Sequence, residues 1–178
     1  MITKNKLNLI IGGPGSGKST LLNHIEKNGF TCFHEISREI ILKAQQEGID
    51  QLFLEKPLLF SEMLLEGRIN QYVNGKNTNQ IVFIDRGIPD VVAYLDFINQ
   101  DYPNHFIKAC ENHSYDQIFI LPPWEEIYIS DNERYESFEQ ALEIHHHLIQ
   151  TYKKFGYQPI EVPKDTVENR YDFIINNL

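Results

Sequence analysis

A glycine-rich segment near the start of the chain has the residue types and spacing of a phosphate-binding loop. The pattern G-x-x-x-x-G-K-[ST] runs from Gly12 to Ser19. Glycines let the backbone turn so that successive N–H groups surround an anion. Lys18 is expected to reach the β- and γ-phosphates of a nucleoside triphosphate, and Ser19 to coordinate Mg²⁺. The residues predicted to bind nucleotide are Gly12, Gly13, Pro14, Gly15, Ser16, Gly17, Lys18, Ser19 and Thr20.

A carboxylate and a guanidinium follow the apolar run of residues 81–84. An Asp at the end of a buried strand in a P-loop protein occupies the Walker-B type of position. Asp85 is therefore predicted to hold Mg²⁺ or to orient a substrate hydroxyl, and its other interpretation is a cap for the helix after Pro89. Arg86 offers a planar fork to a transferring or acceptor phosphate. Its alternative is a salt bridge with a neighbouring acid such as Asp90.

Glu35 ends another strand-like run and supplies a second carboxylate. It is predicted to accept the proton of an attacking hydroxyl or to bind sugar hydroxyls of the acceptor. The alternatives are a solvated loop acid or a capping partner. Arg38 is predicted either to contact the substrate or to form a surface salt bridge. The sequence does not decide whether Glu35 or Asp85 is the base.

The polar segment over residues 123–137 lies where many P-loop kinases carry a lid. A lid folds over the phosphates, excludes water and delivers positive charge. Arg134 is the only basic residue of this segment, so it is the candidate for that charge, and its alternative is a helix-surface arginine beside Glu133. Trp124 either lines the acceptor pocket or packs after the Pro-Pro turn.

Apolar runs that alternate with helical periods predict the frame that positions these residues. Helices are expected from Lys18 to about Asn28, from Pro57 onward, behind a capping box at Ser137, and over residues 166–176. Strands alternating with helices imply right-handed crossovers and a parallel sheet, whose ligands bind beyond the carboxyl ends of the strands. The five expected strands are residues 7–11, 30–34, 81–84, 117–121 and 158–162.

Length, charge and cysteine content narrow the classes of protein to consider. The 178 residues are expected to form one domain, residues 1–178, with a full hydrophobic core. A net charge of −9 argues against a nucleic-acid or anionic-membrane surface, but not against small phosphorylated ligands held by local donors. No apolar run spans a bilayer, and no signal peptide is recognisable. With only two cysteines, a cytoplasmic protein is expected.

Beyond the loop, longer stretches resemble the AAA-type P-loop family associated with the NadR ribosylnicotinamide kinase domain. These stretches are HEISREI, FIDRGIPDVVAY and PPWEEIYISDNERYES, and the resemblance covers nearly the whole chain. It implies a nucleoside-kinase-like three-layer α/β fold, with a five-stranded parallel sheet, helices on both faces and a helical lid. It further implies that Asp85, Arg86, Asp90 and Tyr94 face the acceptor pocket and that Arg134 lies on the lid.

These features predict a kinase that transfers the γ-phosphate of ATP to a hydroxyl or phosphate of a small nucleoside-like molecule. Positioning and electrostatics would supply most of the catalysis, with Arg86 and Arg134 stabilising charge in the transition state. The alternative is a nucleotide-dependent binding module or switch with slow hydrolysis. ATP with Mg²⁺ is expected, and GTP stays open because no base-reading motif is evident. The chain is too short for the C-terminal helical subdomain of ring-forming AAA machines, so a monomer or small homo-oligomer is expected.

Overall fold

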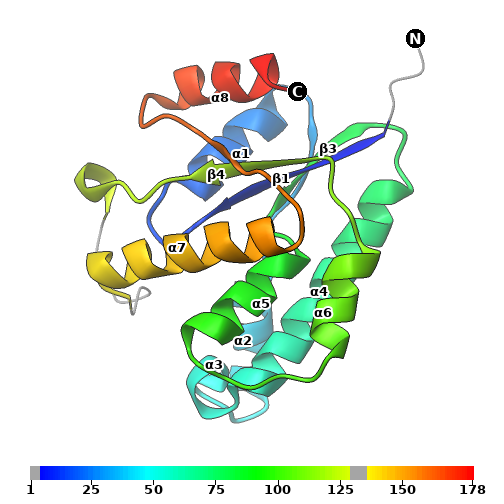
Figure 1. Ribbon diagram of the computed structural model, residues 1–178, viewed down its shortest axis with the longest axis vertical. Coiled ribbons are helices and arrows are strands. Elements are labelled where there is room, and N and C mark those ends of the chain that lie inside the picture. Colours follow the sequence, from blue (N-terminus) through cyan, green and yellow to red (C-terminus); the bar gives the residue numbers. More distant parts are fainter. Residues whose placement is uncertain (1–4, 129–135) are drawn as a thin grey trace.

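A computed structural model of the chain describes residues 5–128 and 136–178, and its centre is a parallel sheet. Five strands lie in the order β2–β3–β1–β4–β5 (Figure 1). In the strand register Ile10 pairs with Asp85, and Gly12 pairs with Leu121, so the carboxyl ends of β1, β3 and β4 share one edge. This confirms the predicted five-stranded parallel sheet. The strands are β1 Lys6–Gly12, β2 Thr31–Phe33, β3 Ile81–Asp85, β4 Gln117–Leu121 and β5 Ile160–Glu161.

Helices cover both faces of the sheet and give three layers (Figure 1). On one face lie α1 (Lys18–Lys27) and α8 (Val167–Asn176), and on the other lie α4 (Pro57–Lys76), α5 (Ile88–Phe97) and α7 (Phe138–Lys154). The side chains of β1 alternate between the two layers, as a strand requires. Ile10 packs with Leu21 and Leu22 of α1. Leu9 packs with Tyr152 of α7 on the opposite face.

A second apolar cluster lies away from the sheet, among helices that extend the molecule on the α4–α5 side (Figure 1). These helices are α2 (Ser37–Gln46), α3 (Leu52–Glu55) and α6 (His105–Asn112). Phe60, Leu64 and Val91 belong to this cluster, and they also line a cavity described below. Within the described part of the chain, no helix combines the length and the apolar character needed to cross a bilayer.

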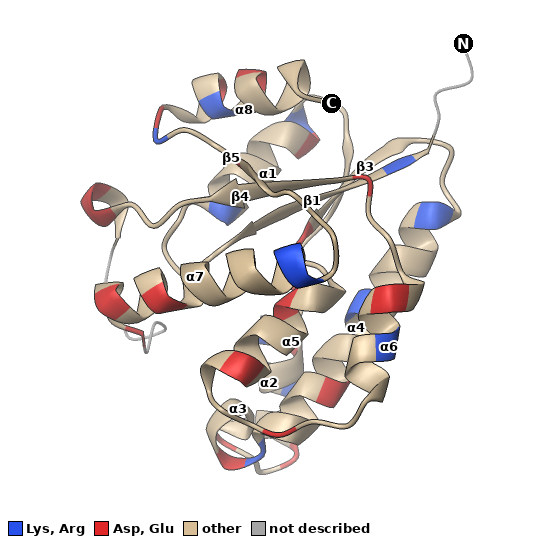
Figure 2. Ribbon diagram, viewed as in Figure 1, with Lys and Arg blue, Asp and Glu red and all other residues tan. Residues whose placement is uncertain are grey.

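Helix α7 begins with the predicted capping box. Ser137 Oγ accepts from the Gln140 backbone N–H at 3.2 Å, and Gln140 Oε1 accepts from the Ser137 N–H at 2.8 Å. Acidic residues occupy the beginning of the helix and basic residues its last turn, as Figure 2 shows. This charge order complements the helix dipole. The helix is thereby fixed at the end that lies against the phosphate loop.

Candidate functional site

The loop between β1 and α1 has the backbone shape of an anion receptacle. Gly15 and Gly17 have φ angles of 69° and 85°, which favour glycine. Gly17 is the N-cap of α1, so the partial positive charge of that helix end lies at the loop. Lys18 is buried, and its Nζ donates to the Gly13 carbonyl at 3.2 Å. The ammonium group therefore lies against the loop that is predicted to hold phosphate.

The loop is packed so tightly that a side chain on Gly12 would clash and one on Gly13 would require its neighbour to shift. A Cβ on Gly12 would lie 2.7 Å from the Leu121 carbonyl oxygen, and one on Gly13 would lie 3.2 Å from the Ala141 carbonyl oxygen. The first contact is with the end of β4 and the second is with α7. The backbone of α7 therefore packs directly against the loop backbone.

Arg170 of α8 supports the loop from the other side of the sheet, and the sequence reasoning missed it. Its side chain is 3% exposed, and Nη2 donates to the Ser16 carbonyl at 3.1 Å. The guanidinium lies 5.7 Å from the centre of the Trp124 ring, a cation–π distance. Trp124 therefore packs against Arg170, which agrees with the packing interpretation rather than with an acceptor-pocket wall.

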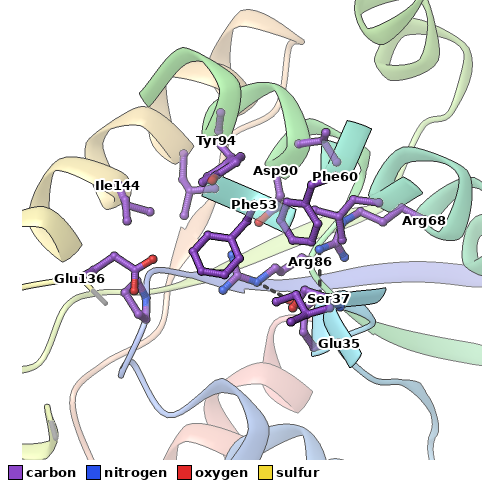
Figure 3. A pocket seen from close by; sticks show the side chains of 16 residues that line it. Glu35, Ser37, Phe53, Phe60, Arg68, Arg86, Asp90, Tyr94, Glu136 and Ile144 are labelled. Atoms are coloured by element: carbon purple, nitrogen blue, oxygen red, sulfur yellow. Dashed lines mark hydrogen bonds and ion pairs between the residues drawn. The ribbon is translucent and has the colours of Figure 1, made fainter. Parts of the chain in front are cut away.

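Glu35 joins two arginines at the carboxyl edge of the sheet. Glu35 Oε2 lies 2.5 Å from Arg86 Nε, and Glu35 Oε1 lies 3.0 Å from Arg68 Nη2 (dashed in Figure 3). Glu35 Oε1 also accepts the Ile36 and Ser37 backbone N–H groups at the start of α2. Arg86 pairs with Glu35 rather than with the neighbouring Asp90 that was its predicted alternative partner. Arg68, on α4, gave no motif signal and was not predicted.

These contacts fix the ionisation of Glu35. Burial by itself raises the pKa of a carboxyl group, but the guanidinium groups of Arg68 and Arg86 outweigh it. With the Ser37 N–H they hold the pKa of Glu35 at about 2. Glu35 is therefore a carboxylate at neutral pH and a weak base.

Arg86 has an unusual backbone conformation. Its φ is 67°, in the left-handed region, where the backbone strain of a residue with a side chain costs about 1–3 kcal/mol. Its N–H donates to the Ile10 carbonyl at 3.1 Å, which joins the turn to β1. Asp85 is the last residue of β3 and Arg86 begins the turn, and the helix that follows has Gly87 as its N-cap. Asp85 therefore does not cap that helix.

Asp85 and Lys18 change each other's protonation across the end of β1 and β3. Burial raises the pKa of Asp85, and the Lys18 charge opposes that rise. Burial, with a smaller effect of the Arg86 charge, lowers the pKa of Lys18 to about 8. Asp85 Oδ1 is buried without a hydrogen-bond partner within the described residues. An unpartnered buried carboxylate oxygen beside a phosphate loop has the chemistry of a Mg²⁺ ligand.

Asp90 connects α5 to α7 beneath the site. Its Oδ2 accepts the Gly87 backbone N–H at 2.8 Å and the Tyr152 hydroxyl at 2.5 Å. Its Oδ1 is buried without a partner in the part of the chain that the structure describes. Asp90 thus closes the first turn of α5 while one oxygen stays available.

A cavity of about 300 Å³ lies next to the loop and brings several predicted residues together. Pro14 of the loop forms part of its wall, so the cavity adjoins the phosphate-binding segment. Glu35, Arg86, Asp90 and Tyr94, which were predicted to contact the acceptor, line it (Figure 3), whereas Asp85 is not among its described lining residues. The remaining described lining residues are Ser37, Ile41, Phe53, Phe60, Leu64, Arg68, Val91, Ala93, Glu136, Ile144 and Leu148.

Other predicted residues lie elsewhere. Arg38 is exposed on α2 and does not belong to the described cavity wall. Ser19 and Thr20 are exposed at the first turn of α1. Arg134 lies outside the described residues, as do residues 129–135 of the predicted lid over residues 123–137. The described beginning of that segment contains η1 (Glu125–Ile127), whose Ile127 lies beside Gly17.

Comparisons with known proteins agree with this geometry. A family profile described as an AAA domain matches residues 8–170, and no curated protein matches the chain. Deoxyadenosine kinase from M. mycoides, with dCMP and dCDP bound, has a TM-score of 0.72 at 19% identity, over 96% of this chain and 97% of that one. Thymidylate kinase from Candida albicans has a TM-score of 0.74 at 17% identity, over 98% and 91%.

The NadR protein in complex with NR has a TM-score of 0.75 at 21% identity, over 97% of this chain and 50% of that chain. The present chain therefore corresponds to half of the NadR chain. These similarities confirm the predicted nucleoside-kinase-like P-loop fold.

Proposed function

The chain belongs to the AAA domain family of P-loop proteins, and from this premise we propose that it is a kinase that transfers the γ-phosphate of ATP to a small nucleoside-like acceptor. The proposal rests on one observation: the phosphate loop and the cavity beside it share a wall. Pro14 belongs to the phosphate loop and also lines the cavity that holds Glu35 and Arg86. A triphosphate on the loop would therefore direct its terminal phosphate into a cavity able to hold an acceptor.

The loop residues have the chemistry to bind a triphosphate, and the nearby Asp85 carboxylate has the chemistry to bind Mg²⁺. The loop N–H groups, the end of α1 and Lys18 would hold the phosphates. Ser19 and the unpartnered Oδ1 of Asp85 would hold the metal ion, directly or through water. The metal would neutralise charge that develops on the transferring phosphoryl group.

The acceptor hydroxyl would lie against Glu35, on the cavity wall. A carboxylate with a pKa of about 2 is a weak base, but phosphoryl transfer passes through a loose transition state in which positioning matters more than proton abstraction. Glu35 would accept a hydrogen bond from the hydroxyl and orient its oxygen. Arg86, held by Glu35, would face the transferring phosphoryl group and stabilise its charge.

Transfer of label from γ-phosphate-labelled ATP to a panel of nucleosides and related alcohols tests the proposal. The protein should label at least one acceptor, and Glu35→Gln and Asp85→Asn should each reduce the rate by about 10²-fold or more, in the range of a lost positioning or metal ligand. Release of label only as inorganic phosphate would favour the alternative, a slow nucleotide-dependent switch. Full activity in both variants would remove both carboxylates from the mechanism.

A further inference from the structure

Asp90, on the cavity wall, receives two hydrogen bonds on one of its carboxylate oxygens. The residue is 5% exposed, and Oδ2 accepts the Gly87 backbone N–H at 2.8 Å and the Tyr152 hydroxyl at 2.5 Å. The bond from Gly87 belongs to the first turn of α5 and is explained by the capping of that helix. The bond from Tyr152 comes from α7, so capping does not account for it.

The Tyr152 hydroxyl is suited to donate this hydrogen bond permanently. The residue is fully buried, and burial together with the Asp90 charge raises the pKa of Tyr152 well above its ordinary value. The phenol therefore keeps its proton at neutral and mildly alkaline pH. Its ring packs with Leu9 of β1 and lies 5.7 Å from the Tyr157 ring, centre to centre, so the hydroxyl has a fixed position.

Gly87 leaves the space through which the hydroxyl reaches Asp90. Its φ of −121° is open to any residue, so the backbone conformation does not require glycine here. The space does, because a Cβ on Gly87 would lie 2.9 Å from Tyr152 Oη and would also clash with the Leu9 side chain. A glycine at the start of α5 is thus matched to a tyrosine on α7.

The side of α7 that carries Tyr152 also borders the cavity and the phosphate loop. Ile144 and Leu148 line the cavity, where Figure 3 labels Ile144, and the Ala141 carbonyl oxygen packs against Gly13. Positions 141, 144, 148 and 152 are three and four residues apart, so they share one side of the helix. The Tyr152 hydrogen bond therefore joins this side of α7 to α5 beside the cavity.

We propose that Tyr152 is a positioning residue for the phosphate acceptor. It holds the Asp90 carboxylate through Oδ2, in the orientation that presents Oδ1 to a hydroxyl or amino group of the acceptor. Oδ1 is buried without a hydrogen-bond partner among the described residues, and a carboxylate oxygen accepts strong hydrogen bonds from such groups. This inference rests on the proposed kinase function and adds to it a residue that acts only through Asp90.

Steady-state kinetics of Tyr152→Phe test the inference, with labelled ATP and with adenosine, guanosine, cytidine, uridine and thymidine as acceptors. The substitution keeps the buried ring and removes only the hydroxyl. For an acceptor that the wild type phosphorylates, KM should rise about tenfold, in the range of one hydrogen bond to a charged group. The kcat and the KM for ATP should stay within about twofold, and a rise in the KM for ATP equal to that for the acceptor would overturn the inference.

Tyr115→Phe is the matched control. Tyr115 is 6% exposed, and its hydroxyl accepts the Ile88 backbone N–H at 3.2 Å in the same turn of α5. The variant should lose stability, measured by urea unfolding, while the acceptor KM stays within about twofold. The same rise in acceptor KM in Tyr115→Phe and in Tyr152→Phe would reduce the effect to a loss of packing and would overturn the inference.

Combined substitutions test whether Tyr152 acts through Asp90. Asp90→Ala removes the carboxylate and should itself raise the acceptor KM, so Tyr152→Phe made in that background should raise it no further. Asp90→Asn keeps the shape of the side chain and gives a second background, in which the effect of Tyr152→Phe should shrink to about threefold or less. A tenfold effect of Tyr152→Phe in both backgrounds would show that the hydroxyl acts by another route.

Binding of the same nucleosides, measured by calorimetry with Mg²⁺ and a non-hydrolysable ATP analogue, separates this inference from the kinase function. Nucleoside binding without transfer, weakened about tenfold in Tyr152→Phe, would support the inference and defeat the kinase function. Transfer with an acceptor KM and a dissociation constant unchanged in Tyr152→Phe would overturn the inference and leave the kinase function intact. Absence of binding by all of these nucleosides would also overturn it, because Asp90 would then meet no donor of this class.

Discussion

Lys18 is a cation whose charge depends on what occupies the loop. Burial lowers its pKa to about 8 in the free protein, and bound polyphosphate would raise it again by opposite charge. Binding therefore takes up protons near pH 8, and the affinity for triphosphate should fall as the pH rises above 8.

Calorimetry at pH 8 in two buffers of different ionisation enthalpy measures that uptake. Wild type should show net proton uptake, whereas Lys18→Arg, which stays charged, should lack this contribution. The same binding enthalpy for wild type in both buffers would show that Lys18 does not titrate in this range.

Glu35 makes the stability of the protein depend on pH in the acid range. Its folded pKa of about 2 lies below its ordinary value of 4.5, so its ion pairs stabilise the fold above pH 4.5. That contribution is lost as the pH falls from about 4.5 to about 2. Urea unfolding of Glu35→Gln should give lower stability at pH 7 and a flatter curve between pH 4.5 and 2, with wild type and variant converging at the acid end.

The exposed Glu143→Gln is the control, and it should follow wild type throughout. If Glu35→Gln lost stability in parallel with wild type over this range, the ion pairs would not be the source of the dependence.

Arg170 is expected to hold the loop in its binding shape. Arg170→Met removes the hydrogen bond to Ser16 and the charge, and it should weaken triphosphate binding by about tenfold, the effect of one charge-assisted hydrogen bond. Arg170→Lys should restore part of the affinity. Titrations with Mg·ATP measure both, and an unchanged dissociation constant in Arg170→Met would show that the loop is rigid without it.

At the scale of elements, the strands and helices with a clear local sequence pattern could be predicted. Residues that reach the site only through tertiary packing could not. The strands at β1, β3 and β4 were predictable because all three are nearly uniform apolar runs ending in polar residues. The short α3 and the helix α6 lack strong periodic or capping signals and were not predicted. Arg68 and Arg170 belong to the site only because α4 and α8 fold against the loop edge, which no spacing along the chain reveals.

Helix α7 provides a prediction at this scale, since its capping box fixes the end that packs on Gly13. Ser137→Ala removes the hydrogen bond to the Gln140 N–H and should lower the free energy of unfolding by about 1 kcal/mol. Urea unfolding measures this, with Glu143→Ala on the exposed side of the helix as the control. A loss in Ser137→Ala no larger than in the control would mean that the cap contributes nothing.

At the scale of the whole molecule, the phosphate loop is where the two helical layers and the sheet meet. Arg170 approaches it from the α8 side, and the Ala141 backbone packs on it from the α7 side. Occupation of the loop is therefore expected to stabilise the entire fold, by about 2.7 kcal/mol when the ligand is at 100 times its dissociation constant. The cavity opens on the same loop, so nucleotide and acceptor would meet where both layers are fixed.

Calorimetric titration of Mg·ATP into the wild-type protein and into Lys18→Ala tests most directly whether this loop is a triphosphate site. The wild type should bind at one site, and the variant should lose affinity by about 10²-fold or more, because a buried ammonium paired with phosphate is removed. Heat absent from the wild-type titration, or the same affinity in both proteins, would contradict the account.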